Sequence, residues 1–292
     1  MELHQLRYLV AVADLGSFTA AAARLHVSQS GVSAQIAKLE HEVGHRLLDR
    51  RGRTVSATAA GHEVLPHARA ALASIATIDA VSDELSGVVR GSLRLGTVIG
   101  CTVPGYLAGF AAFRRAHPGV SVSVVESNSD LLIDDLAAGR LDVALVAHTD
   151  PLPDEVTGLT VIREPVAVVV PVGHPWAARD SVACAELVDV TVLSLPPGTG
   201  VRSALASTCA VARVDVTPAV AAHSPDSVLA LVELGSGVGV LTAAMAVERD
   251  ALAAIPVTDS VETSLSLAVG STPSAAARAM TAALANELLP AQ

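Results

Sequence analysis

Four polar side chains recur at helical spacing within the first 40 residues and could bind DNA. Gln29, Ser30 and Ser33 fall within about one helical turn, and Lys38 follows on or near the same face. Amide and hydroxyl groups bind base edges in the major groove, and an ammonium group pairs with phosphate. The spacing therefore predicts a helix face that reads duplex DNA.

A cluster of arginines follows directly in the run LLDRRGRTVSATAAG, residues 47–61. Arg50, Arg51 and Arg53 fall in a turn between two short extended pieces. Guanidinium groups on such a turn reach phosphates or a minor groove, so the run predicts a two-stranded wing. The alternative interpretation is a solvated basic turn.

Charge is distributed unevenly along the 292 residues, whose formal net charge is −10. Residues 1–90 hold nine basic and nine acidic residues, whereas residues 91–292 hold ten basic and twenty acidic residues. Residues 24–53 carry a local charge of +3. A modest basic patch beside a large acidic remainder favours a small phosphate-facing head on a body with another role.

The polar face needs a helical pair to position it. Ser17 and Ser28 are placed as N-caps of two short helices joined by about three residues, with Val27 expected to be buried in the connection. Residues 3–15 supply a third helix. Apolar side chains recur on each of the two short helices at Phe18, Ala21, Ala22 and Leu25, and at Val32, Ile36, Leu39 and Val43. These patterns predict a helix-turn-helix whose second helix enters the major groove.

One rival motif, HEVGH at residues 41–45, has the HExxH spacing of zinc proteases. That chemistry needs both histidines on one continuing helix, and Gly44 stands where the helix should end. We therefore expect no metal site, and no other cofactor is indicated.

Residues 6–65 resemble the N-terminal domain of LysR-type transcriptional regulators. The resemblance is carried by GSFTAAAARLHVSQSGVSAQIAKLEHEVGHRLLDR, by the basic wing and by TAAGHEVLPHARAAL. It implies an α+β multi-domain protein with a winged helix-turn-helix, a long linker helix, and a two-lobed α/β effector-binding domain like a periplasmic binding protein. The family commonly has proline at Ser30 and often arginine at Ala34 and Ala37, so this reading face is less cationic.

The expected boundaries place the DNA-binding domain at 1–58 and the linker helix at 59–87. The effector-binding domain spans 91–292, with lobe I at 91–162 and 267–292 and lobe II at 163–266. The linker helix carries a seam of apolar side chains at Val64, Ala68, Ala71, Ile75, Ile78 and Leu85. Such a seam favours pairing between two copies, and hence a homodimer on an imperfect inverted repeat. The resemblance further implies a tetramer.

Seven short β-branched runs beyond residue 90 alternate with helical stretches and predict buried parallel strands. The resemblance implies that the chain crosses between lobes near 162–166 and returns near 262–267. Ligands bind at such strand ends, and helix N-termini there favour a carboxylate or another anion. The residues expected to bind the effector are Thr97, Gly100, Cys101, Thr102, Ser127, Asn128, His148, Thr199, Arg202 and His223.

Other classes of function fit the sequence less well. Three widely spaced cysteines without a CxxC motif are typical of small apolar filler. A redox-responsive regulator acting through Cys209 is one alternative, but by resemblance Gly200 stands where the reactive thiol should be. A solute-binding module that reads no DNA is another. No catalytic motif, signal peptide or long apolar run is present, so we expect a cytoplasmic protein that is no enzyme and has no membrane partner.

Overall fold

The computed structural model describes residues 1–50, 54–85, 90–101 and 103–289, except for the side chains of residues 73 and 76–85. The chain separates into two compact units. The first comprises residues 1–88 with 138–140, and the second comprises residues 89–137 and 141–292.

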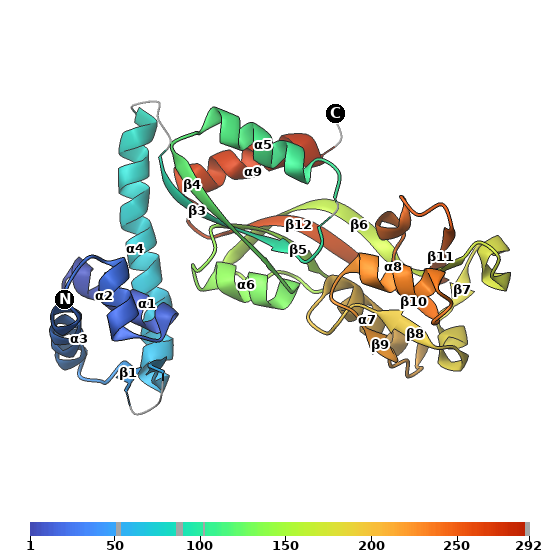
Figure 1. Ribbon diagram of the computed structural model, residues 1–292, viewed down its shortest axis with the longest axis horizontal. Helices are drawn as coiled ribbons and strands as arrows, with labels where there is room; N and C mark the ends of the chain where they lie inside the picture. Colours follow the sequence, from blue (N-terminus) through green and yellow to red (C-terminus); the bar gives the residue numbers. More distant parts are fainter. Residues whose placement is uncertain (51–53, 86–89, 102, 290–292) are drawn as a thin grey trace. The chain divides into compact units, whose positions relative to one another are not determined.

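The N-terminal unit is a winged helix-turn-helix followed by one long helix (Figure 1). Ser17 and Ser28 cap the second and third helices as expected, their hydroxyls accepting from the backbone N–H groups of Ala20 and Gly31. The elements are α1 (Leu3–Leu15), α2 (Phe18–Arg24), α3 (Gln29–Val43), β1 (Leu48–Asp49), β2 (Ser56–Ala57) and α4 (Ala59–Leu85).

The core of this unit forms where the three short helices meet the wing and the start of α4. Its fully buried side chains include Leu9, Val32, Ile36 and Leu39, so the apolar spacing of α3 does face inward. The expectation for Val27 was wrong, because its side chain is 39% exposed. The turn is closed instead by the backbone, since the N–H of Val27 donates to the carbonyl of Ala22 at 3.0 Å.

The structure describes four of the six side chains of the predicted α4 seam. Ala68 is buried, and Val64, Ala71 and Ile75 are half-buried. The side chains of Ile78 and Leu85 lie outside the described residues. On another face of α4, Leu65 joins the core, and the guanidinium of Arg69 pairs with the carboxylate of Asp14 at 2.5 Å. This ion pair ties α4 to α1.

The second unit is built on one sheet of ten strands that runs through two lobes. The principal order is β4-β3-β5-β12-β6-β10-β8-β9, with β11 paired to β6 and β7. The strands are β3 (Gly91–Val98), β4 (Val120–Ser127), β5 (Val143–His148), β6 (Val156–Pro171), β7 (Val182–Ala183), β8 (Val192–Ser194), β9 (Val220–Ala221), β10 (Val238–Thr242), β11 (Leu252–Thr258) and β12 (Glu262–Gly270).

Helices cover the faces of each lobe (Figure 1). In lobe I, α5 and α9 pack together on one side of the strands and α6 lies on the other. In lobe II, α7 and α8 cover the strands, and three short 3₁₀-helices lie in the described connections. The bounds are α5 (Tyr106–Ala116), α6 (Ser129–Ala137), α7 (Gly200–Ala212), α8 (Pro225–Glu233), α9 (Ala275–Leu288), η1 (Pro175–Ala178), η2 (Cys184–Asp189) and η3 (Ala243–Ala246).

The expectation of parallel strands holds within each lobe and was wrong for the strands that join the lobes. Strand β3 is parallel to β4 and β5, and β8 is parallel to β9 and β10. Strands β6 and β12 are antiparallel to each other, and each is antiparallel to its other partners. They carry the chain from one lobe to the other and back, so they run in opposite directions.

Strand β4 is an exposed edge, contrary to the expectation of a buried strand. Val124 and Val125 are 49% and 43% exposed. The strand pairs only on one side, with β3, in the part of the chain that the structure describes.

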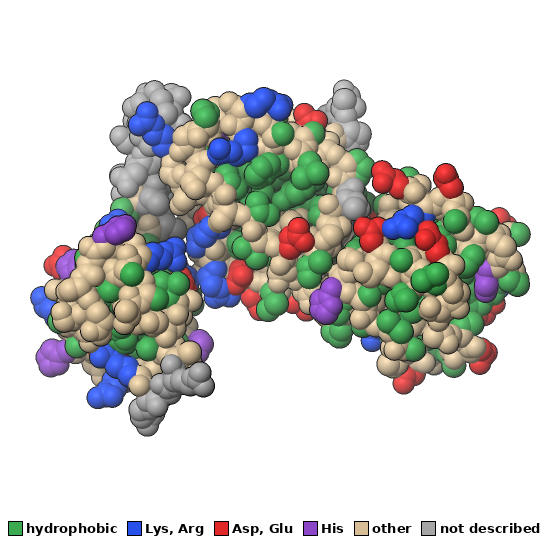
Figure 2. Space-filling model, in the orientation of Figure 1, with side chains coloured by type: hydrophobic (Ala, Val, Ile, Leu, Met, Phe, Trp, Pro, Cys, Tyr) green, Lys and Arg blue, Asp and Glu red, His purple; other side chains and the backbone are tan. Residues whose placement is uncertain are grey.

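Charged side chains are distributed over the surface as the sequence indicated. Figure 2 shows Lys, Arg and His side chains spread over the N-terminal unit, and Asp and Glu side chains gathered on lobe II. Of the described helices, none has the length and apolarity that crossing a membrane requires.

Candidate functional site

The predicted DNA-reading face lies on the surface of α3. Gln29 and Ser30 are exposed in its first turn, and Lys38 is exposed two turns later. The hydroxyl of Ser30 donates to that of Ser28 at 3.3 Å, next to the N-cap. Ala34 and Ala37 lie between these polar groups and are also exposed. The first turn of α3 can therefore approach base edges closely.

Arg50, which is expected to contact DNA, directs its side chain toward α3 and is 39% exposed. Its guanidinium donates to the hydroxyl of Ser33 at 3.3 Å, pairs with the carboxylate of Glu40 at 3.3 Å, and lies 4.7 Å from the ring centroid of Phe18. Strand β1 of the wing, which ends just before Arg50, pairs with β2 in antiparallel register. The other two predicted wing residues, Arg51 and Arg53, lie outside the described residues.

A buried amide pair holds α3 against α1, and sequence reasoning missed it. Gln5 is fully buried, and its amide donates to the side-chain oxygen of Gln35 at 3.1 Å. Its own oxygen accepts the backbone N–H of Glu2 at 2.8 Å. The signal available in the sequence was a glutamine on the inward side of α1, at a position that an apolar residue usually takes.

The HExxH run does not form a metal-binding helix. Helix α3 ends at Val43 and Gly44 adopts a left-handed conformation with φ of 80°, so His45 leaves the helical path. The carboxylate of Glu42 pairs with the N-terminal ammonium group, which lowers the pKa of Glu42. Across the described residues, no group of three or more His, Cys, Asp or Glu side chains is placed to hold a metal.

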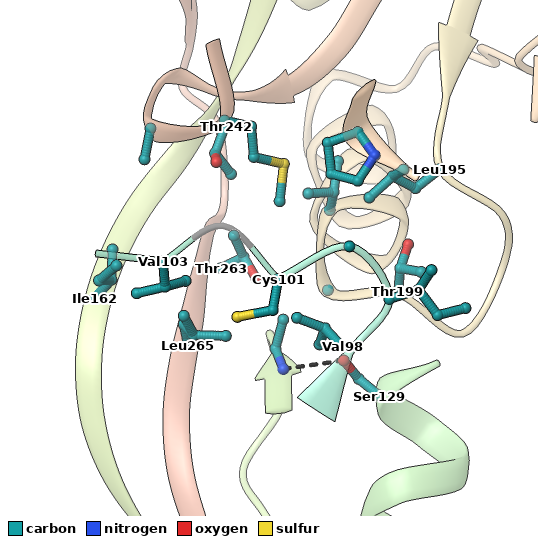
Figure 3. Close-up of a pocket in the computed structure, with 18 of the residues that line it drawn as sticks. Val98, Cys101, Val103, Ser129, Ile162, Leu195, Thr199, Thr242, Thr263 and Leu265 are labelled. Atoms are coloured by element: carbon teal, nitrogen blue, oxygen red, sulfur yellow. Dashed lines mark hydrogen bonds between the residues drawn. The ribbon is translucent and has the colours of Figure 1, made fainter. Parts of the chain in front are cut away.

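A second site lies in the two-lobed unit, where a cavity of about 110 Å³ opens among the carboxyl ends of strands and the N-termini of helices (Figure 3). Its walls come from both lobes and from the crossing strands β6 and β12. Most of its lining is apolar. The apolar residues are Val98, Ile99, Gly100, Cys101, Val103, Pro104, Ala147, Ile162, Leu195, Gly200, Val201, Pro225, Ala244, Met245 and Leu265.

Six of the ten predicted effector-binding residues line this cavity. They are Gly100, Cys101, Ser127, Asn128, Thr199 and His223. Thr102 lies outside the described residues. The prediction that Thr97, His148 and Arg202 line the site is not supported, because none of them reaches the cavity.

Each of these three residues has a local reason to face elsewhere. Thr97 is buried within β3, on the opposite face from Gly96, which abuts Leu132 of α6. Both ring nitrogens of His148 are engaged, one with the carbonyl of Asp150 at 2.8 Å and the other with the Ser266 hydroxyl at 2.9 Å. Arg202 lies in the first turn of α7, where its backbone N–H donates to the Thr199 hydroxyl, and it does not line the cavity.

Three helices begin at the cavity wall. Ser129, Gly200 and Pro225 are the first residues of α6, α7 and α8, and all three line the cavity. Thr199 caps α7 by accepting from the backbone N–H of Arg202, and it donates to the carbonyl of Pro196 at 2.9 Å. Free N–H groups and the positive end of a helix dipole favour a negatively charged group at such positions.

The polar side chains of the lining include groups that the sequence did not single out. Glu164 is the one formally charged residue among the described lining residues, and its carboxylate accepts from the N–H of Ala244 at 3.2 Å. Thr242 is 2% exposed, and its hydroxyl has no hydrogen-bond partner in the described structure, nor does the side-chain oxygen of Asn128. Glu164 and Thr263 lie on the predicted crossings, which was the one available signal.

Gly200 allows α7 to approach the crossing strands closely. A Cβ atom placed there would lie 2.6 Å from both the Cβ of Ala147 and the hydroxyl oxygen of Thr263. Since real Cβ contacts are never so short, a side chain at residue 200 requires α7 to move. The first turn of α7 can therefore lie at the cavity only because residue 200 has no side chain.

Two of the three cysteines lie side by side in lobe II. Cys184 and Cys209 are buried with their sulfur atoms 3.6 Å apart, and both are free thiols. Burial raises the pKa of the Cys184 thiol to about 12, with a further contribution from the neighbouring thiol. Cys101 is half-buried at the cavity.

A capped helix-turn-helix with a wing and a ligand-sized cavity in a two-lobed α/β unit define a DNA-binding regulator with an effector domain. The comparisons make this assignment specific. The family profile described as "Bacterial regulatory helix-turn-helix protein, lysR family" matches residues 3–62, and "LysR substrate binding domain" matches residues 86–289. The chain belongs to the LysR family of transcriptional regulators, which confirms the family and the fold class predicted from the sequence.

Known relatives cover most of the chain. The RuBisCO operon transcriptional regulator of Allochromatium vinosum is 35% identical over 207 residues, which are 70% of this chain and 67% of that protein. A full-length single-substitution variant of OxyR from Pseudomonas aeruginosa has a TM-score of 0.76 at 23% identity, covering 98% of this chain and 95% of that one. Full-length CbnR in complex with its target DNA has a TM-score of 0.59 at 24% identity, covering 99% and 100%.

Proposed function

We propose that this chain works as a homodimer that inserts the first turn of α3 into the major groove at each half of an imperfect inverted repeat. The observation that carries the proposal is the exposure of Gln29 and Ser30 at the capped start of α3. The amide of Gln29 has the geometry to bind adenine, and hydroxyls bind several base edges. We place the protein in the cytoplasm with its DNA, and we expect it to act by binding rather than by catalysis.

Pairing of two copies is supported by α4. This helix is 27 residues long and carries Ala71 and Ile75 half-buried along the predicted seam, whereas Val64 packs against the core of its own unit. A two-fold pair would present two reading helices to two half-sites about one helical turn apart or a multiple of it. Pairing of dimers into a tetramer is the extension that the family resemblance suggests.

The DNA proposal is tested by selecting bound sequences from random duplex DNA and then measuring affinity by fluorescence anisotropy. Replacing Gln29 with Ala should relax the preference at one base pair of each half-site, at a cost of about 1–3 kcal/mol. Ser181→Ala, at an exposed loop position of the two-lobed unit, is the control and should change nothing. A solute-binding module that reads no DNA would show no duplex binding even at low salt.

We propose further that the effector is a small, largely aliphatic carboxylic acid that also carries a hydroxyl or amino donor. The apolar walls suit an aliphatic body, and the N-termini of α6, α7 and α8 suit one carboxylate. Glu164 disfavours a second negative charge, because no Lys or Arg side chain lines the described part of the cavity. The unpartnered oxygen atoms of Thr242 and Asn128 favour a ligand with its own donor.

Thermal-shift and calorimetric titrations test this effector class. Hydroxy and amino monocarboxylates should bind, whereas dicarboxylates, phosphate esters and uncharged sugars should not. Glu164→Gln should weaken an amino acid by about tenfold, because a charge-assisted hydrogen bond is lost, and should weaken a hydroxy acid less. Glu155 is exposed and does not line the cavity, so Glu155→Gln serves as the control. A clear preference for dicarboxylates would contradict the proposal.

A further inference from the structure

Arg50 is placed where a phosphate contact would be expected, yet its side chain, 39% exposed, makes its contacts within its own unit. It directly follows β1, and its guanidinium contacts three side chains of α2 and α3. It donates to Ser33, pairs with Glu40 and lies over the face of Phe18. The planar guanidinium suits this combination, since it can stack on an aromatic ring while its edge donates hydrogen bonds.

Glu40 makes this arrangement stronger than a surface ion pair. Its side chain is only 12% exposed. One carboxylate oxygen accepts the backbone N–H groups of Leu47 at 2.9 Å and Leu48 at 3.1 Å, and the other pairs with Arg50. The carboxylate thus holds the end of the connection from α3, the start of β1 and the Arg50 side chain together. Removing Arg50 leaves one oxygen of the largely buried Glu40 carboxylate without its cation, and removing the Glu40 carboxylate leaves the Leu47 and Leu48 amides without their acceptor.

We infer that Arg50 is a positioning residue that fixes the wing against α3, rather than a residue that neutralises a DNA phosphate. The inference rests on the proposed DNA-reading face. Arg50 acts through Glu40, which binds the Leu47 and Leu48 amides. Arg50 thereby fixes the orientation of β1, and hence of the wing, relative to α3. The phosphate and minor-groove contacts of the wing then fall to residues beyond Arg50.

The same contact orients Ser33 on the reading face. A hydroxyl group has one hydrogen to donate, and the oxygen of Ser33 already accepts from Arg50. Arg50 occupies one of the two acceptor lone pairs of the hydroxyl and leaves its hydrogen free, so we expect Ser33 to favour base edges that accept, such as the N7 and O6 atoms of guanine, over the amino groups of cytosine and adenine. Arg50 in this way shapes specificity through another residue.

Salt dependence separates the two roles of Arg50. Affinity for the selected operator is measured by fluorescence anisotropy at several KCl concentrations for the full-length wild type, Arg50→Ala, Arg50→Lys and Glu40→Gln. Each phosphate neutralised contributes about −0.9 to the slope of log K against log salt. A positioning role predicts that all three variants bind about tenfold or more weakly with the wild-type slope. A phosphate contact predicts a shallower slope for Arg50→Ala and unchanged or tighter binding for Glu40→Gln.

Lys38→Ala is the matched control, because Lys38 is exposed on α3 and can reach a phosphate. This variant should lose about 0.9 from the slope. Base preference at the Ser33 position should also broaden in Arg50→Ala, and should stay unchanged in Lys38→Ala. An unaltered base preference in Arg50→Ala would overturn the orienting role assigned to Arg50.

Hydrogen exchange provides a readout that needs no DNA. The amides of Leu47 and Leu48 should exchange at least tenfold faster in Glu40→Gln and Arg50→Ala than in the wild type, while the amides in the core of α1 keep their protection. Unchanged exchange at Leu47 and Leu48 would overturn the inference even if DNA binding fell. If the wild type bound no duplex DNA but these amides behaved as expected, the failure would belong to the proposed function and the positioning role would stand.

Discussion

The sulfur atoms of Cys184 and Cys209 lie 3.6 Å apart, with Cys184 at the start of η2 and Cys209 near the end of α7. Both residues belong to the buried core of lobe II and are at most 7% exposed. The pair connects two segments far apart in the sequence, and α7 also begins at the cavity. Its chemistry therefore bears on whether the effector domain responds to oxidants.

We expect this pair to be inert in the folded protein. Because burial raises the pKa of Cys184 to about 12, its reactive thiolate is scarce at neutral pH. Treatment with hydrogen peroxide or iodoacetamide, followed by peptide mass spectrometry, should modify Cys101 first and leave Cys184 and Cys209 intact until the protein unfolds. Rapid oxidation of Cys184 and Cys209 to a disulfide in the native state would instead support the redox alternative through Cys209.

Introducing a methyl group at residue 200 should destabilise the two-lobed unit. In Gly200→Ala, the new Cβ would meet Ala147 and Thr263 at 2.6 Å, so α7 must shift, at a cost of about 1–3 kcal/mol. Gly173→Ala is the control, because the exposed Gly173 has open space around its Cβ position. Chemical denaturation should show the loss only for Gly200→Ala, and equal stability of the two variants would contradict the close approach described here.

The buried amide pair of α1 and α3 can be tested by a double-mutant cycle. Gln5→Leu should cost about 1–3 kcal/mol, because the half-buried oxygen of Gln35 loses its donor and the N–H of Glu2 loses its acceptor. Replacing both glutamines with Leu should recover much of that loss, since no buried polar group then remains unpaired. Hydrogen exchange of the α1 and α3 amides measures Gln5→Leu, Gln35→Leu and the double variant. Additive losses in the double variant would argue against a direct interaction.

Lobe II should become less stable in acid, because protonation of Glu186 breaks its ion pair with Arg179. Hydrogen bonds from Arg179 and from the N–H of Ala183 lower the pKa of Glu186 to about 2, from an ordinary value of 4.5. A carboxyl whose pKa is lower when folded stabilises the protein above its unfolded pKa, and this contribution disappears as pH falls toward 2. Because the group is solvent-exposed, the effect is modest.

Comparing unfolding of wild type and Glu186→Gln from pH 7 to pH 2 isolates this contribution. The wild type should be the more stable protein above about pH 4.5, and the difference should shrink steadily in more acidic solution. Glu155→Gln, which removes an exposed carboxylate, should show no such trend. A difference that stays constant with pH would show that Glu186 contributes by packing rather than by its charge.

The helix-turn-helix was predictable because its signals are local. Capping serines, Gly16 and Gly44 at helix ends, and apolar spacing each act within a few residues, and the three helices form where these signals place them. Arg50 was harder to interpret, because a guanidinium in a basic turn suits phosphate as well as it suits Glu40. Its contacts depend on Phe18, which lies 32 positions earlier in the chain.

Strand direction and the cavity lining were only partly predictable, because both depend on contacts between segments far apart in the sequence. Short β-branched runs indicate burial but not direction, so the antiparallel pairing of β6 and β12 required knowledge of which lobe each enters. Thr242, Met245 and Thr263 line the cavity through long-range folding and carry no motif. His148 was a reasonable ligand by residue type, yet Ser266, far along the chain, occupies one of its ring nitrogens.

The two lobes are joined by strands that remain hydrogen-bonded through the crossing, not by slack loops. β6 passes from β12 to β10 and β11 close to Pro165, and the β6–β12 ladder carries a register shift between Leu265 and Ser266. A proline lacks an amide hydrogen and a bulge loosens pairing, so bending there is least costly. Any closure of the lobes on a ligand must bend these strands while they stay paired. The strands straighten again when the ligand leaves the cavity, which favours a graded and readily reversible response over one that stays locked in the closed form.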